Sequence, residues 1–392
     1  MSESDSTRAA PAQGVHVAGS DAPEKKRLRI GFVPLTDCAP LVVAHKMSLA
    51  ARYGITLELV RQPSWAAIRD KLLSGELDAA HALYGLVYGV QLGIGGPQAD
   101  MAVLMTLNQN GQAITLSRTL YDAFAQGAPL PALLAALAHR PVFAQTFPTG
   151  THAMWLYYWL AAQGVHPLRD VRCVVIPPPQ MTAALAQGLL DGFSAGEPWN
   201  AVAQSEGVGV TAVASSEIWP DHPEKVLACR RDFVALYPNT ARALTAVLLE
   251  ACRWLDAPDN REQAAEWLSE PDYVGRPARD IAPRMLDAYG RAGTSARGAA
   301  PLRFFNEGAV NFPYRTDGAW FVSQYLRWGL IDGQQALDSV AAEVNQAALY
   351  REAAHLAGVA LPPSDTRQSV LIDGRVWRGD IVGFATEAAL RA

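Results

Sequence analysis

The first regular stretch of the sequence reads Leu28-Arg29-Ile30-Gly31-Phe32-Val33. It is followed by apolar residues at helical spacing over 39–53, by Gly54, and by a second alternating stretch over 55–60. A short apolar run is typical of a buried strand, and a glycine directly after the last helical residue marks a helix end. The order strand, helix, strand predicts a β-α-β unit, in which the two strands are parallel.

The alternation of helix and strand continues beyond this unit. We expect a helix over 65–73, a strand over 77–83, a helix around Val90 and a strand over 102–107. Alternating elements of this kind favour a parallel or mixed sheet with helices on its faces. The polar turn 108–112 then interrupts the pattern, and we expect the first hinge there.

A second β-α-β pattern starts at Pro141. Its predicted elements are a strand over 141–146, a helix over 152–163, a strand over 171–176, a helix over 181–188 and a strand over 192–195, before 208–214 crosses back. We therefore predict an α/β protein of two lobes joined by a hinge. The predicted parts are a disordered N-terminal tail over 1–27, lobe one over 28–112 and 214–392, and lobe two over 113–213.

The C-terminal part of lobe one, from Val226 onward, is expected to be mostly helical. Ala-rich amphipathic stretches predict helices over 239–255, 261–268, 279–291, 317–328 and 334–356. Residues 369–383 are expected to form a short hairpin around Asp373-Gly374, because Asp-Gly is a favoured hairpin turn.

The composition excludes several classes of protein. The chain has 392 residues, half of them apolar, and a formal net charge of −5, with lysines and arginines scattered, which excludes a basic surface for nucleic acid. No stretch is long enough to span a bilayer, and residues 1–27 lack the apolar segment of a secretory leader. The four cysteines lie far apart, without a CxxC pair or a histidine at ligand spacing. We therefore expect a cytoplasmic protein that contacts neither membrane nor nucleic acid directly.

Specific segments resemble a known family. They are Gly31 to Asp37, Ser64-Trp65, Asn108 to Gln112, Thr146 to His152, Pro177 to Met181, Gly196 to Asn200 and Trp219 to Lys225, with Arg327 to Gly329 and Leu349 to Ala353 further on. Together they closely resemble the nitrate-binding and bicarbonate-binding proteins of ABC transporters (NrtA and CmpA type). The resemblance implies a type II periplasmic-binding-protein-like fold, with the ligand cleft between the two lobes.

The resemblance also implies the ligand-binding residues. In the family, a tryptophan, a glutamine, a histidine and a lysine hold the anion, and the matching positions here are Trp65, Gln112, His152 and Lys225. Further residues expected to contact the ligand are Thr36, Asp37, Gly150, Thr151 and Glu197. No metal is expected, because the family's bicarbonate branch recruits a metal where the nitrate branch has the lysine. No cofactor or catalytic residue is expected either. Glu224 keeps the metal alternative open.

The chemistry of the four matched residues suits nitrate. Nitrate is a planar monoanion with acceptor oxygens only, so its site needs donors in several directions and about one positive charge. Lys225 supplies the charge, His152 donates from the start of a helix, Gln112 offers an amide, and Trp65 offers an indole N–H and an apolar wall.

Each of these residues also has an ordinary structural interpretation. Taken singly, His152 would be a helix cap, Lys225 a solvated turn residue and Trp65 part of the core. Only their joint pattern favours a binding site. His81 and Asp78, on a predicted buried strand, are expected to be structural.

The leading functional hypothesis is a nitrate or nitrite sensor, because the expected cytoplasmic location departs from the transporter proteins. The chain resembles the cytoplasmic sensors of the NasS type, which pair with an ANTAR-domain, RNA-binding antiterminator and release it on anion binding. The alternatives are the substrate-binding subunit of a nitrate or bicarbonate ABC importer and a pyrimidine-precursor enzyme of the same fold. The enzyme alternative needs a catalytic His and Cys motif that the sequence lacks.

Overall fold

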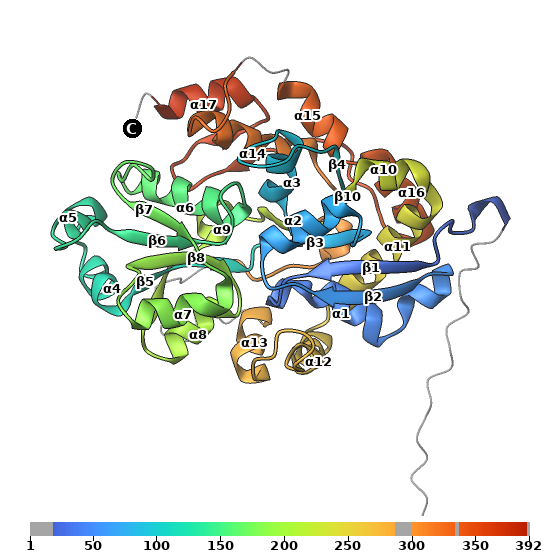
Figure 1. Cartoon of the computed structure of the whole chain (residues 1–392), viewed down its shortest axis with the longest axis horizontal. Coiled ribbons are helices and arrows are strands. Elements are labelled where there is room, and N and C mark those ends of the chain that lie inside the picture. Colours follow the sequence, from blue (N-terminus) through green and yellow to red (C-terminus); the bar gives the residue numbers. More distant parts are fainter. Residues whose placement is uncertain (1–18, 287–298, 334–336, 390–392) are drawn as a thin grey trace, which may run out of the picture.

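The computed structural model describes residues 19–286, 299–333 and 337–389, and it contains two five-stranded mixed sheets with helices on their faces (Figure 1). Sheet one has the order β2 (Thr56–Arg61), β1 (Arg27–Phe32), β3 (Ala79–Leu83), β10 (Pro223–Arg230) and β4 (Met101–Gln109). Sheet two has the order β7 (Arg172–Val175), β6 (Val142–Gln145), β8 (Gly192–Gly196), β5 (Gln112–Ser117) and β9 (Gly209–Ala214). The two-lobed α/β architecture expected from the sequence is therefore present.

The two sheets share one construction. In sheet one, β1 runs parallel to β2 and β3, whereas β10 runs antiparallel to β3 and β4. In sheet two, β6 runs parallel to β7 and β8, whereas β5 runs antiparallel to β8 and β9. Both β5 and β10 come directly after a crossing from the other lobe. Each crossing therefore delivers its strand to an interior position of the sheet that it enters.

The chain crosses between the lobes twice. The first crossing lies between Gln109 and Gln112, where Asn110 and Gly111 both have positive φ angles, 61° and 90°. The second runs from the end of β9 through the short helix α9 (Ser215–Ile218) to the start of β10. Two short connections of this kind form a hinge about which two lobes can open and close.

The helices of lobe one cover both faces of sheet one. They are α1 (Ala39–Lys46), α2 (Trp65–Ser74), α3 (Tyr84–Gln91), α10 (Arg231–Leu236), α11 (Pro238–Trp254), α12 (Pro258–Leu268), α13 (Ala278–Met285), α14 (Arg315–Arg327), α15 (Leu337–Val344), α16 (Ala347–Leu356) and α17 (Ile381–Ala389). Those of lobe two are α4 (Arg118–Ala125), α5 (Leu130–Ala135), α6 (Thr151–Ala162), α7 (Pro178–Ala186) and α8 (Trp199–Ser205). In Figure 1, α14 and α17 lie above the green second lobe and the blue first lobe, and α14 contacts α6.

Several predicted elements need correction. The sequence predicts mainly helices from residue 226 onward, but β10 is an interior strand of sheet one, buried from Pro223 to Cys229. The helix predicted over 39–53 is broken at Ser48, whose φ angle is 53°. The helix predicted over 334–356 is interrupted at Asn345, because the Asn345 amide bonds with the hydroxyls of Tyr84 and Tyr88.

The prediction of a disordered tail is wrong for residues 19–27. The carboxylate of Glu24 accepts hydrogen bonds from the backbone N–H groups of Asn239 and Thr240, at the start of α11. The backbone N–H of Lys25 donates to the Thr240 hydroxyl. Residues 1–18, like the end of the helix predicted over 279–291, lie outside the described residues.

The C-terminal hairpin is confirmed. Strand β11 (Ser369–Val370) pairs antiparallel with β12 (Val376–Trp377), and Gly374 in the turn has a positive φ angle of 78°. The hydroxyl of Tyr158 on α6 donates to Asp373 in this turn, 2.9 Å away, so the hairpin contacts lobe two. Within the described ranges no helix is long and apolar enough to cross a membrane.

Candidate functional site

The candidate site is centred on Lys225 of β10, which is fully buried. Its Nζ lies 2.5 Å from Oε1 of Glu224 and 2.8 Å from Oδ2 of Asp37. Adjacent residues of a regular strand point to opposite faces, but the pairing of β10 with β4 shifts register on both sides of Lys225. A β-bulge re-aims side chains, and here it lets both Glu224 and Lys225 reach one buried cluster.

The cluster keeps its charges despite burial. Burial alone would lower the pKa of Lys225, but the carboxylates of Asp37 and Glu224 hold that pKa above its usual value. Burial alone would raise the pKa values of the two acids. The Lys225 ammonium outweighs this effect of burial at both acids. With His81 as a second partner, it holds the pKa of Asp37 below its usual value, and with His152 it lowers the pKa of Glu224 to about 2.

His152 approaches this cluster from the other lobe. It lies in the first turn of α6, close to the helix N-cap Gly150. Its Nδ1 is 2.6 Å from the hydroxyl of Thr146, and its Nε2 is 3.3 Å from Oε1 of Glu224 and 3.4 Å from Nζ of Lys225. Burial lowers the pKa of His152, and the Lys225 ammonium lowers it further. The imidazole is therefore neutral at pH 7.

Trp65 and His81 form a wall beside Lys225. The centroid of the Trp65 ring lies 5.7 Å from Nζ of Lys225, 5.5 Å from the centroid of His81 and 6.4 Å from that of His152. Nε2 of His81 is 2.8 Å from Oδ1 of Asp37. The indole Nε1 of Trp65 is buried and meets no hydrogen-bond acceptor among the described residues. It is a donor without an acceptor next to a buried cation.

Gln112 lies opposite Gly196 in sheet two, and this pairing places its side chain on the face toward the cluster. Gln112 at the start of β5 pairs with Gly196 of β8, and paired residues of neighbouring strands present their side chains on the same face. A Cβ on Gly196 would lie 3.5 Å from Oδ2 of Asp37 and 3.6 Å from Nε2 of His152, so this face is the one toward the cluster. Both side-chain polar atoms of Gln112 are buried and have no partner in the described part of the chain.

The structure thus brings Trp65, Gln112, His152 and Lys225 together. Each is at most 1% exposed. They come from α2 and β10 on the side of sheet one and from β5 and α6 on the side of sheet two, so each lobe supplies two of them. Gln112, predicted as the last residue of the first segment of lobe one, is the first residue of β5 in sheet two. Because no helix or strand carries more than one of the four, the grouping is a product of the tertiary fold.

The other residues expected to contact the ligand differ in whether their side chains reach the cluster. Asp37 lies in the cluster, but its carboxylate bonds with Lys225 and His81. Thr151 donates to the backbone oxygen of Glu224 at 3.5 Å, and Gly150 serves as the N-cap before it. The hydroxyl of Thr36 is buried without a described partner.

Glu197 does not turn its carboxylate to the cluster. One oxygen accepts from the backbone N–H of Ala201 and the other lies 3.4 Å from Nε of Arg284 on α13. Its backbone oxygen also meets lobe one, where it accepts from the backbone N–H of Thr36 at 2.8 Å. Glu197 therefore joins the two lobes, and its expected contact with the ligand stays a prediction.

The two lobes are closed over the cluster. Besides the Thr36–Glu197 bond, the hydroxyl of Tyr325 on α14 lies within hydrogen-bond distance of the backbone oxygens of Gly85 in lobe one and Thr149 in lobe two. A Cβ on Gly89 would lie 2.2 Å from the Thr149 hydroxyl, so glycine permits this close approach. Contacts between the two lobes therefore shield the cluster from solvent.

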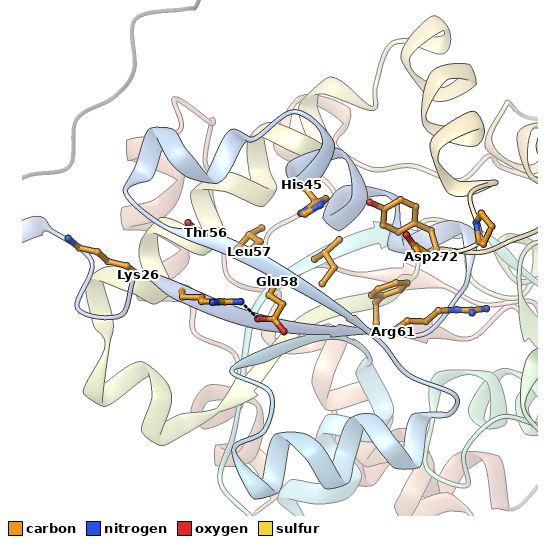
Figure 2. Close-up of a pocket in the computed structure, with 12 residues that line it drawn as sticks. Lys26, His45, Thr56, Leu57, Glu58, Arg61 and Asp272 are labelled. Atoms are coloured by element: carbon orange, nitrogen blue, oxygen red, sulfur yellow. Dashed lines mark hydrogen bonds and ion pairs between the residues drawn. The ribbon is translucent and has the colours of Figure 1, made fainter.

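A large surface hollow lies elsewhere and has a different character. It measures about 800 Å³ and is lined by β1 and β2 together with His45, Asp272 and Tyr273 (Figure 2). None of the four matched residues lines it, and its Glu58 is ion-paired with Arg27. Its charges of both signs and its open position distinguish it from the buried cluster.

Comparison with known proteins identifies the family. The chain matches the NMT1-like family over residues 21–269. It is 35% identical, over 92% of its length, to the nitrate/nitrite binding protein NrtA of Nostoc sp., of which it covers 84%. The chain belongs to the NMT1-like family. This NMT1-like chain is also 36% identical, over 96% of its length, to the nitrate import ATP-binding protein NrtC of Synechocystis sp., of which it covers 57%.

A solved structure confirms the fold class of this NMT1-like chain. The crystal structure of the periplasmic nitrate-binding protein NrtA from Synechocystis is 32% identical in sequence and superposes with a TM-score of 0.87. The match covers 94% of this chain and 99% of that one. The type II periplasmic-binding-protein-like fold, with two lobes around a cleft, is therefore the fold of this protein.

Sequence reasoning missed three residues of the cluster. His81 is buried and has Asp37 as a partner, as a structural histidine should, but the sequence does not show that it packs against Trp65 in the cluster. Glu224 was considered only as a metal ligand, whereas it is the nearest partner of Lys225. Gly196 is part of a segment that resembles the family, but its close approach to Asp37 and His152 is visible only in the structure. A histidine inside an apolar strand was the available signal for His81, because burying an imidazole requires a partner.

Proposed function

We propose that this protein binds nitrate or nitrite in the cleft between its two lobes. The proposal is supported by the relatives named as nitrate-binding proteins and by the four matched residues around one buried cation. The observation that carries it is Gln112, whose amide is buried opposite Gly196 with neither polar atom bonded in the described structure. An unpaired buried amide costs free energy, which a bound anion would recover at the donor atom.

The donors suit a small oxyanion. Lys225 has three N–H donors, of which Asp37 and Glu224 engage two. Nε2 of His152, the indole N–H of Trp65 and the amide of Gln112 approach from other directions. Buried side chains on all sides exclude water, which strengthens each of these bonds.

We propose binding without catalysis. Cys38, Cys229 and Cys252 are buried, and burial raises the pKa of each thiol, so none supplies a thiolate nucleophile at neutral pH. The lysine is engaged by two carboxylates and stays protonated, which removes it as a nucleophile as well.

The physiological role has two candidates. The relatives favour the first, a substrate-binding subunit of a nitrate importer. The second is the cytoplasmic sensor that sequesters an ANTAR-domain antiterminator. Its support is that all four cysteines are unpaired thiols, as is usual in a reducing compartment.

Calorimetric titration of the wild type and Gln112→Met tests the binding proposal. Methionine fills a similar volume without polar atoms, so we expect anion affinity to fall at least tenfold while the free energy of unfolding stays equal or rises. Gln187→Met, on the exposed end of α7, is the matched control and should bind as the wild type does. Unchanged nitrate affinity in Gln112→Met would remove this amide from the site.

A second experiment separates the two roles. The protein is mixed with an ANTAR-domain antiterminator on a sizing column, with and without nitrate. A complex that nitrate dissociates supports the sensor, through a coupling of about 1–3 kcal/mol. Absence of a complex, together with nitrate-dependent binding to importer membrane subunits, supports transport.

A further inference from the structure

We propose that the anion binds together with one proton, and that His152 takes up this proton. The inference rests on the proposed anion-binding function and deepens it, because it makes the proton a second ligand of the same site. It is carried by the charges gathered in the buried cluster and by the hydrogen bonds of its three imidazoles.

The charge balance of the cluster is unfavourable for an anion. Within it, two carboxylates, Asp37 and Glu224, face a single ammonium, Lys225. With neutral imidazoles the formal charge is −1, and a monovalent anion would bring it to −2. All three ionic side chains are at most 1% exposed, so solvent does not screen this charge. A proton that enters with the anion cancels the added charge.

The charged and titratable side chains near His152 come from three elements and one loop. The 3₁₀ turn Thr36–Cys38 presents Asp37, β3 presents His81, and β10 presents Glu224 and Lys225. The loop before β10 presents His222, whose Nδ1 lies 3.6 Å from Oε2 of Glu224. The aromatic neighbours Trp65 and Trp155 are uncharged.

Hydrogen bonding selects His152 among the three imidazoles. Its Nδ1 faces the hydroxyl of Thr146, which can donate to a bare nitrogen or accept from a protonated one. A protonated His152 therefore keeps a partner at Nδ1 and still presents Nε2–H to the anion. Nδ1 of His81 is buried with no acceptor in the described residues, so a proton there would be unpaired.

His222 is excluded by its position. Its Nε2 is 2.7 Å from the hydroxyl of Ser215 and its Nδ1 is 3.1 Å from the backbone oxygen of Pro223, and neither nitrogen contacts Lys225 in the described structure. Its ring packs against Trp155 at a centroid distance of 4.6 Å. Among the three, only His152 has a nitrogen near Lys225 and a partner for the added proton.

Proton uptake has a measurable consequence for affinity. An anion beside His152 favours the imidazolium, so the pKa of His152 rises on binding. Where one proton is taken up per anion, affinity falls about tenfold for each unit of pH above that raised pKa. Nitrate and nitrite should behave alike, since both stay anionic at neutral pH.

The test is nitrate titration by calorimetry at pH 7.5 in two buffers of different ionisation enthalpy. The difference in heat gives the number of protons exchanged, and we expect an uptake approaching one per nitrate in the wild type. His152→Gln should bind more weakly with no uptake. His81→Asn, which also alters the cluster, should retain uptake.

The outcomes are distinguishable. Nitrate binding without proton uptake in the wild type overturns the inference and leaves the binding function standing. Uptake that persists in His152→Gln overturns the assignment to His152. No heat with any oxyanion overturns both proposals. If His152→Gln does not fold, ¹⁵N-histidine spectra of the wild type decide: nitrate must convert one neutral imidazole to imidazolium, and no conversion refutes the proposal.

Discussion

Replacing Lys225 by methionine should reveal how much the fold depends on the buried ammonium. Methionine retains most of the volume but leaves Asp37 and Glu224 as two buried carboxylates without their cation. The difference between a Glu224 pKa of about 2 and its ordinary value of 4.5 corresponds to roughly 3 kcal/mol at neutral pH. Breaking a buried ion pair costs about 3–5 kcal/mol, which agrees with this figure.

The assay is urea unfolding of wild type and Lys225→Met at pH 7 and pH 4. In the wild type, the lowered pKa values of both acids contribute stability above about pH 4.5, which is lost as the pH falls through the folded-state values. In the variant, burial favours the protonated acids, so its deficit should shrink at pH 4. The control is Lys46→Met, because Lys46 forms a partly exposed pair with Glu270 and should cost under about 1 kcal/mol. Equal losses in the two variants would refute the reasoning.

Three further predictions concern the same cleft. Gly196→Ala should weaken nitrate binding at least tenfold in titrations, with little change in unfolding free energy. The reason is that the added methyl would lie 3.2–3.6 Å from Leu35, Asp37 and His152. Unaltered affinity would contradict this. Nitrate affinity should be the same in excess chelator, since no described group of acids and histidines can hold a metal; binding restored by calcium would contradict it. The melting temperature of the ligand-free protein should fall as the pH drops from about 6.5 toward 4, because burial lowers the pKa of His222 to about 4 and the unfolded state binds the proton more readily. A flat profile in that range would contradict the lowered pKa of His222.

Much of the fold could be predicted from periodicity. Helices such as 65–74 and 151–162 and the strands of both β-α-β patterns lie within a few residues of their predicted positions. The exception is β10. Its apolar run of four residues, Val226 to Cys229, lies between the charged Glu224-Lys225 and Arg230-Arg231, which favours a short surface segment. Only tertiary pairing with β3 and β4 makes it an interior strand.

The cluster could be foreseen only in part. The resemblance to the transporter proteins implied that Trp65, Gln112, His152 and Lys225 would meet, and the structure brings them to one buried cluster. Neither composition nor spacing showed that two carboxylates would flank Lys225. That arrangement depends on the bulge in β10 and on closure of the lobes, and both are properties of the folded chain. A lysine that the sequence presents only as an anion ligand is therefore also expected to stabilise the fold.

Because β10 lies between β3 and β4, sheet one can be completed only after β10 has been synthesised. Strands β3 and β4 belong to the first part of the chain, yet the strand that joins them is synthesised only after the whole of lobe two. A nascent chain therefore carries two unpaired strand edges in lobe one while lobe two is being completed, and such edges invite aggregation. Lys225 arrives on the joining strand itself. The cluster cannot form before both lobes have been synthesised. A chain that ends before β10 therefore lacks the proposed anion site and leaves strand edges that chaperones can bind.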